Sequence, residues 1–140
     1  MMSQLTPELY VTDLEDSLAF YCGLLGFEID YERPEESFAC LKRGAVGLML
    51  EEPVGRTWIT ATLERPFGRG VNFQIMIENV EHVYAKCLQC DAKIFVPLEH
   101  RSYRRRDEMV SLPQFVVQDP DGYLIRLAHV SGTPPNETDK

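Results

Sequence analysis

The chain carries the same layout twice, and this repeat limits the folds open to it more than any other feature. Each copy is an alternating run of apolar and polar residues, then an Asp or Asn suited to capping a helix, then a helix pattern; the copies begin at Glu8 and Asn72. A repeat of this size usually means that two similar units build one core. With 140 residues, the chain is long enough for one domain with a sizeable core.

The bulk composition excludes several classes of protein. A chain that is 44% hydrophobic and 26% charged is an ordinary globular protein. Its formal net charge of −8 disfavours binding to a nucleic-acid backbone as the main role. No apolar run approaches the ~20 residues that span a bilayer, so no membrane role is expected. No secretory signal is visible at the N-terminus, and a cytoplasmic location is expected.

The four cysteines are therefore expected to be cytoplasmic thiols. Cys87 and Cys90 form a C-x-x-C motif, but it lies at the end of a helix pattern and has no second pair at zinc-ligand spacing. Packed thiols are the favoured interpretation, and a redox or metal site is the alternative.

The first unit is predicted over residues 5–52. Its alternating first strand ends at Val11, and Asp13 is a good N-cap with Asp16 in the capping-box position. The helix that follows ends at Gly26. Its predicted apolar face consists of Leu14, Leu18, Tyr21 and Leu25. A second alternating run (27–31), a turn (34–36) and a hairpin (37–42 with 46–51) complete a β-α-β-β-β unit.

The second unit is predicted over residues 70–130, after a linker at 53–69. It contains a strand over 71–78, a helix over 80–89 with Asn79 as its cap, and strands over 93–96, 115–118 and 123–129. The two units form one domain, 1–130. The polar tail, 131–140, is expected to be disordered.

The second unit is longer than the first. Asp13 matches Asn79 at an offset of 66 and Met49 matches Arg126 at an offset of 77, so an insertion of 11 residues falls near Leu98–Leu112. We expect a long irregular stretch there. The basic segment Arg101–Arg106 within it is interpreted as a solvated loop, and a loop that closes over a ligand is the functional alternative.

At this point the chain resembles the vicinal oxygen chelate superfamily, the glyoxalase and bleomycin-resistance fold. The resemblance rests on the duplicated unit order and on three motifs: DLEDSLAFY from Asp13, LGF from Leu25, and FVVQDPDG from Phe115. It implies an α+β fold in which two tandem βαβββ units form a half-barrel cleft. Because isomerases, dioxygenases, thiol transferases and drug-sequestering proteins share this fold, the resemblance leaves the chemistry open.

The metal enzymes of this superfamily bind their ion with His, Gln or Glu from the first and last strands of each unit. Carried over onto this sequence, the four positions are Thr6, Met49, Asn72 and Arg126. Thr and Met are poor ligands for a hard or borderline divalent ion, and Asn is weak without a carboxylate beside it. Arg126 would place a permanent positive charge where the ion would sit. We therefore expect no metal and no cofactor.

This departure resembles the bleomycin-resistance branch, which also lacks the metal ligands and carries Arg in its last strand. That branch implies a homodimer with an exchanged N-terminal arm, for which Pro7 is suited. It also implies antibiotic resistance by sequestration of a drug-like, aromatic or cationic molecule. The alternatives are a glyoxalase-, epimerase- or dioxygenase-type enzyme, including a metal-free one with Glu8 or Glu51 as general base, and a purely interacting domain.

The expected ligand-binding residues follow from strand parity and from the positions of large aromatic side chains. Arg126 is expected to take the place of the metal by pairing with Glu8 and Glu51. No catalytic residue is assigned. The expected ligand-binding cleft is lined by Thr6, Glu8, Phe38, Met49, Glu51, Trp58, Asn72, Gln74, Tyr103 and Arg126.

Overall fold

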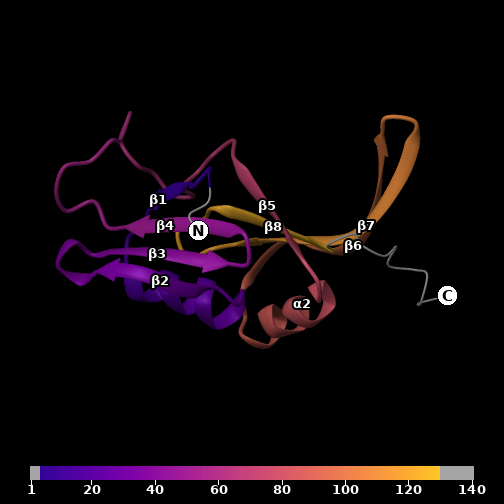
Figure 1. Cartoon of the computed structure of the whole chain (residues 1–140), viewed down its shortest axis with the longest axis horizontal. Helices are drawn as coiled ribbons and strands as arrows, with labels where there is room; N and C mark the ends of the chain where they lie inside the picture. Colours follow the sequence, from indigo (N-terminus) through magenta and orange to yellow (C-terminus); the bar gives the residue numbers. More distant parts are fainter. Residues whose placement is uncertain (1–3, 130–140) are drawn as a thin grey trace. The chain divides into compact units, whose positions relative to one another are not determined.

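The computed structural model describes residues 4–129, and the chain divides into two compact units, Met1–Phe67 and Gly68–Lys140. Each unit holds one four-stranded sheet and one helical segment (Figure 1). The expected polar tail, 131–140, lies outside the described residues.

The first unit has the predicted β-α-β-β-β order. Its sheet has the strand order β1-β4-β3-β2, in which β1 runs parallel to β4 and the other pairs are antiparallel. The elements are β1 (Glu8–Tyr10), α1 (Leu14–Leu18), the π-helical turn η1 (Ala19–Leu24), β2 (Glu28–Arg33), the 3₁₀ turn η2 (Pro34–Glu36), β3 (Phe38–Arg43) and β4 (Val46–Glu51).

The helical segment begins as predicted and then departs from a regular helix. Asp13 Oδ1 accepts hydrogen bonds from the backbone N–H groups of Glu15 and Asp16, at 3.0 and 3.3 Å. From Ala19 the hydrogen bonds lengthen by one residue, as in Leu25 N–H to Phe20 O at 3.1 Å. The predicted apolar face is therefore partly wrong. The buried residues of this segment are Ser17, Phe20, Tyr21 and Leu25, whereas Leu14 and Leu18 are half-buried.

The second unit repeats the order, and its sheet runs β5-β8-β7-β6 with β5 parallel to β8. Asn79 lies at the N-cap of its helix, but its side chain makes no capping hydrogen bond, contrary to the predicted cap. The elements are β5 (Asn72–Ile77), α2 (Val80–Gln89), β6 (Lys93–Arg105), β7 (Glu108–Gln118) and β8 (Leu124–His129).

The predicted irregular stretch at 98–112 is wrong: these residues lie on a long hairpin of β6 and β7. Paired residues extend from Glu99 opposite Gln114 to Arg105 opposite Glu108. Because β8 pairs with β7 only over Gln114–Gln118, residues 99–113 form a two-stranded ribbon that projects beyond the sheet (Figure 1). We call it the β6–β7 ribbon. The 11-residue insertion thus lengthens a hairpin, and the basic segment lies on a strand and its turn.

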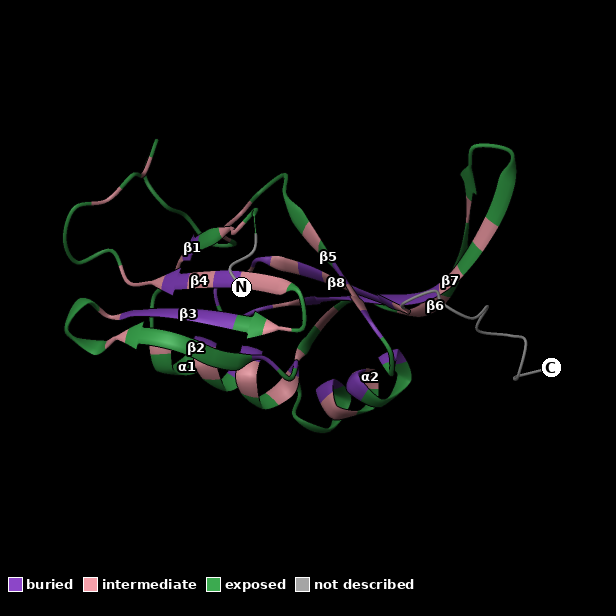
Figure 2. Cartoon of the chain, in the orientation of Figure 1, coloured by how far each residue is buried: buried purple, intermediate pink, exposed green. Residues whose placement is uncertain are grey.

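The core of each unit lies between one face of the sheet and the helical segment. In the second unit Ile75, Ile77, Ile125 and Leu127 are buried, whereas Asn72 and Gln74 are exposed (Figure 2). Because side chains alternate along a strand, this pattern confirms the predicted parity of β5 and β8. Arg126 therefore lies on the face opposite the helix.

The turn between β7 and β8 is fixed by one carboxylate. Asp119 Oδ1 accepts hydrogen bonds from the backbone N–H groups of Asp121, Gly122 and Tyr123, each at 2.9 Å. Gly122 has a φ of 104°, which a side chain would disfavour. The turn sets the register of β8 against β7, and hence the position of Arg126.

We predict that Asp119→Ala lowers the free energy of unfolding by about 2–3 kcal/mol, because it removes a buried charged acceptor shared by three N–H groups. Urea denaturation measures the change. The matched control is Asp107→Ala at the exposed end of the β6–β7 ribbon, which should change stability by less than about 0.5 kcal/mol. Equal effects of the two substitutions would contradict the assigned role of Asp119.

Candidate functional site

Four of the predicted site residues lie on one face of the first sheet, opposite its helix. The strand register places Glu8 beside Met49 and both Tyr10 and Phe38 beside Glu51. Neighbours in register share a face. Thr6 precedes β1 and lies outside this register. Glu8 is exposed, and Met49 and Glu51 are half-buried.

Glu8 and Glu51 form a carboxyl pair on this face. Burial raises the pKa of Glu51 above its ordinary value of 4.5, and the hydrogen bond with Glu8 and the charges of Glu8 and Glu36 raise it further. The charge of Arg33 acts in the opposite direction. Glu51 therefore holds its proton more tightly than an isolated carboxyl group would.

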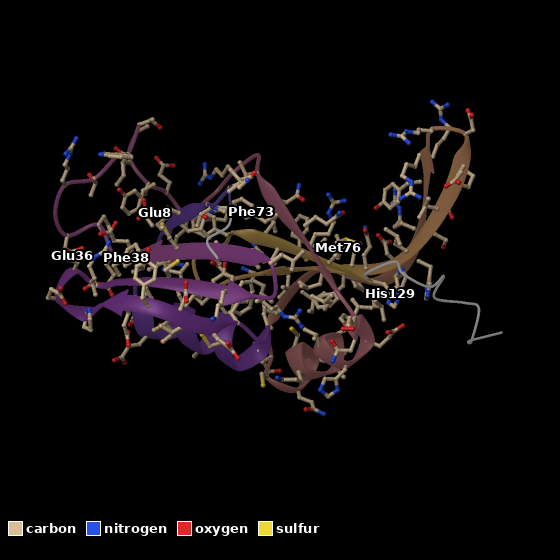
Figure 3. The ribbon with its side chains drawn as sticks, viewed as in Figure 1. Glu8, Glu36, Phe38, Phe73, Met76 and His129 are labelled. Carbon is tan, nitrogen blue, oxygen red and sulfur yellow. The ribbon has the colours of Figure 1, made fainter. Side chains whose placement is uncertain are left out.

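The sequence predicts that Phe38 lines the ligand-binding cleft, but its side chain is not accessible to a ligand. Its side chain is only 2% exposed, and the guanidinium of Arg33 lies 4.0 Å from its ring centroid. Arg33 is held there by Glu36, with 2.7 Å between Nε and Oε1. Figure 3 labels Glu8, Glu36 and Phe38 in this unit. The internal cation–π contact shows that a cation is accepted over this ring and beside the carboxyl pair.

Trp58 lies on the segment that follows β4 and is 75% exposed. Its backbone N–H donates to the hydroxyl of Tyr10 at 2.9 Å, and the Arg65 guanidinium donates to the hydroxyl of Thr12 at 3.1 Å. These two bonds fasten the segment to the start of the unit. Trp58 is thus an aromatic surface held near β1 and accessible to solvent.

The corresponding face of the second sheet carries Arg126. The register places Arg126 beside Gln74 on β5 and beside Val116 on β7. Asn72 and Gln74 are exposed, and Gln74 Nε2 lies 3.5 Å from Met76 Sδ, a weak contact. Within residues 4–129, Nε of the half-buried Arg126 has no hydrogen-bond partner.

Gln114 on β7 is a residue that the sequence interpretation missed. It is 5% exposed, and its Oε1 has no hydrogen-bond partner among the described residues. It lies opposite Ala128, two residues from the Val116–Arg126 pair, and therefore shares the face of Arg126. The available signal was one glutamine at the start of the apolar run Phe115–Val117.

Two further sequence candidates lie away from these faces. Tyr103 is half-buried on the β6–β7 ribbon, with the Arg101 guanidinium 5.8 Å from its ring centroid. Cys87 is buried on α2, and burial followed by the charge of Cys90 raises the pKa of its thiol. Cys90 is exposed, so within the C-x-x-C motif the packed-thiol interpretation fits Cys87 and not Cys90.

Comparison with known proteins gives the family. Residues 3–127 match the model of the Glyoxalase/Bleomycin resistance protein/Dioxygenase superfamily. The chain belongs to this superfamily. A bleomycin resistance protein from Geobacillus stearothermophilus is 26% identical over 132 residues, which cover 89% of this chain and 94% of the relative.

Solved structures are also similar. TioX from Micromonospora sp. ML1 has a TM-score of 0.71 and 18% identity, covering 91% of this chain and 98% of its own, and so supports the fold alone. A superfamily member from Vibrio splendidus 12B01 is 39% identical, covering 87% of this chain and 93% of its own, with a TM-score of 0.41. Neither helix among residues 4–129 is long and apolar enough to cross a membrane.

The residues at the superfamily's metal-ligand positions do not fit a metal. Thr6 and Met49 in the first unit, and Asn72 and Arg126 in the second, supply one permanent cation and no carboxylate or imidazole. Across residues 4–129, no group of three or more His, Cys, Asp or Glu is placed to hold an ion. His82 lies on α2 and His129 ends β8, whereas His100 lies on a strand and not in the predicted loop.

The raised pKa of Glu51 gives a pH-dependent stability. Because the folded chain holds this proton more tightly than the unfolded chain, the free energy of unfolding falls as the pH rises from the ordinary value of 4.5 through the raised pKa. We predict that Glu51→Gln removes this decline. At neutral pH it should stabilise the chain by less than about 1 kcal/mol, because the pair is partly open to solvent.

Thermal denaturation between pH 4 and pH 8 measures this effect. Glu28→Gln, on the exposed strand β2, is the control and should leave the pH profile as in the wild type. The prediction would be contradicted if, above pH 4.5, the stability of the wild type rose with pH relative to that of Glu51→Gln. The pKa of Glu51 would then not be raised in the folded chain.

Proposed function

We propose that this chain is a metal-independent small-molecule-binding protein that sequesters a drug-like cationic or aromatic ligand. The observation that carries the proposal is the residue set at the superfamily's ligand positions, where Arg126 replaces a metal-binding side chain. The similarity to a bleomycin resistance protein supports it. Binding without a reaction requires no Lewis acid, so the loss of metal ligands leaves this role intact.

The carboxyl pair is the proposed anchor for the cationic end of the ligand. Burial, followed by the hydrogen bond and charge of Glu8, raises the pKa of Glu51, and an approaching cation would oppose this shift by favouring the charged carboxylate. The contact of Arg33 with Phe38 is a model within the chain itself for a guanidinium at this position. Trp58 offers an exposed ring for stacking with an aromatic ligand.

Arg126 is the fixed cation of the proposal. Its guanidinium would help to organise a bound ligand, as a metal does in other members of the superfamily. Nε of Arg126 has no hydrogen-bond partner among the described residues, which supports a role for this side chain in binding a further group.

An enzyme of the glyoxalase, epimerase or dioxygenase type is the second candidate. One observation favours its metal-free form: the raised pKa of Glu51 moves its carboxyl group towards the range suited to general acid–base catalysis. Glu51 would be the residue that moves the proton. Turnover of a substrate in metal-free buffer, abolished by Glu51→Gln, would favour this candidate over sequestration.

A homodimer in the cytoplasm completes the proposal. On β6 and the β6–β7 ribbon, Phe95 and Met109 are 58% and 68% exposed, and an isolated two-stranded ribbon is only marginally stable in water. Both features favour a partner subunit. Pro7 O accepts a hydrogen bond from Met49 N–H at 2.9 Å, so an exchanged arm would begin before Pro7. The four free cysteines fit a reducing compartment.

Calorimetric titration tests the ligand class. We predict that a bleomycin-type cationic drug binds more tightly than an S-alkyl glutathione, and that its affinity rises as the pH increases through the raised pKa of Glu51. Glu51→Gln should weaken drug binding by about tenfold, the effect of one charge-assisted hydrogen bond. Glu28→Gln is the control. Tighter binding of the glutathione series would overturn the proposal.

Metal addition tests the other half of the proposal. We predict that Ni²⁺, Zn²⁺ and Mn²⁺ do not bind stoichiometrically and do not change the affinity for the drug. The reason is that the side chains at the superfamily's metal-ligand positions are poor ligands for these ions. Equilibrium dialysis followed by elemental analysis measures the bound ion. Arg126→His, which restores a ligand-type side chain, is the comparison. The enzyme candidate would be supported instead if the wild type bound one equivalent of metal and if Arg126→Ala increased this amount or Thr6→Ala abolished it.

A further inference from the structure

We infer that Gln114 and Arg126 form a subsite for a neutral carboxamide-type group of the ligand, on the face of the second sheet opposite α2. The inference rests on the proposed binding function and names a chemical feature of its ligand. It depends on residues of the second unit alone and is therefore separable from cation binding by Glu8 and Glu51.

The sheet register brings the two side chains to one place. Arg126 on β8 lies beside Val116 on β7, and Gln114 lies beside Ala128, one diagonal step away. Diagonal neighbours on a sheet are separated by about 7–8 Å, a distance that two long side chains can bridge through one small group. Both side chains are on the face opposite α2, because the alternate residues Ile125 and Leu127 are buried in the core.

Each side chain leaves one buried polar atom without a partner. Nε of Arg126 is a donor, Oε1 of Gln114 is an acceptor, and neither has a hydrogen-bond partner within residues 4–129. A buried polar group without a partner is costly, and folded proteins contain few of them. Two such atoms of opposite character on one small area indicate that a group outside residues 4–129 supplies a matching donor and acceptor.

The chemistry of the two atoms selects the group. A primary carboxamide presents a carbonyl oxygen to the Arg126 N–H and an N–H to the Gln114 oxygen. A carboxylate presents acceptors only, so its negatively charged oxygen would face the Gln114 Oε1 acceptor without a hydrogen bond. An ammonium presents donors only and would be repelled by Arg126. Of these three groups, only the neutral amide satisfies both atoms.

The surroundings favour a group of this size and polarity. Val116 and Ala128 are buried beside the two polar side chains and supply an apolar floor. Gln74, the other register neighbour of Arg126, is exposed, and its amide makes a weak contact with Met76 Sδ. It is thus available to bond to the remainder of the ligand.

Titration of the full chain with benzamide and benzoate, matched in shape and different in charge, tests the inference. The wild type should bind benzamide about tenfold more tightly than benzoate, the effect of one well-made hydrogen bond. Gln114→Met, which keeps the side-chain length and removes the acceptor, should lose this preference. It should also raise the melting temperature of the ligand-free chain, because it removes a buried oxygen that lacks a partner.

The matched control is Gln118→Met, on the same strand and the same face but with a partner, since its amide lies 3.5 Å from Gly122 O. It should keep the benzamide preference and should not raise the melting temperature. A second measurement needs no variant: the side-chain amide resonances of Gln114 in the wild type should shift with benzamide and not with benzoate.

The outcomes separate this inference from the proposed function. Equal or tighter binding of benzoate, an unmoved Gln114 resonance, or a bridging water that benzamide does not displace would each overturn the subsite. A chain that gives one of these results and still binds a cationic drug through Glu51 would keep the proposed function. A chain that binds benzamide through Gln114 and no cationic drug would keep the subsite and lose the cation anchor.

Discussion

Each sheet can cover only one of its faces with its own helix, and the site depends on this constraint. Strict alternation then separates the residues: in the second unit Ile75 and Ile77 enter the core, and Gln74 faces away from it. A slip of one residue would exchange the two sets. Asp119 prevents a slip between β7 and β8, because its carboxylate fixes three N–H groups of the turn. The position of Arg126 is therefore a consequence of a turn seven residues earlier.

The two sheet faces opposite the helices have opposite chemistry. The first carries Glu8 and Glu51, and burial followed by the hydrogen bond and charge of Glu8 raises the pKa of Glu51. The second carries Arg126 and Gln114, which leave a donor and an acceptor without partners among residues 4–129. In the metal enzymes of this superfamily one ion dominates the site, whereas here fixed side chains supply the charge. Side chains of this kind can bind and orient a ligand but cannot act as a Lewis acid.

The sequence predicted the features that depend on short-range periodicity. Alternation placed Arg126 and Gln74 on the sheet face opposite the helix, and the Asp13 cap was found from residue type. It could not predict the β6–β7 ribbon, because four arginines obscure the alternation of Tyr103, Val110 and Leu112 on its strands. The covering of Phe38 by Arg33 depends on side-chain packing across strands. Gln114 was missed because one polar residue does not alter an apolar pattern.

Glu51 and Gln114 are the positions where the chain departs from what stability alone would favour. An apolar residue beside Phe115 would leave no buried oxygen without a partner, and a neutral residue in place of Glu51 would remove a carboxyl repulsion. Natural sequences are otherwise locally consistent, so departures of this kind concentrate at functional sites. The two departures lie on the sheet faces opposite the helices and not between a sheet and its helix. That distribution supports the proposed ligand-binding role.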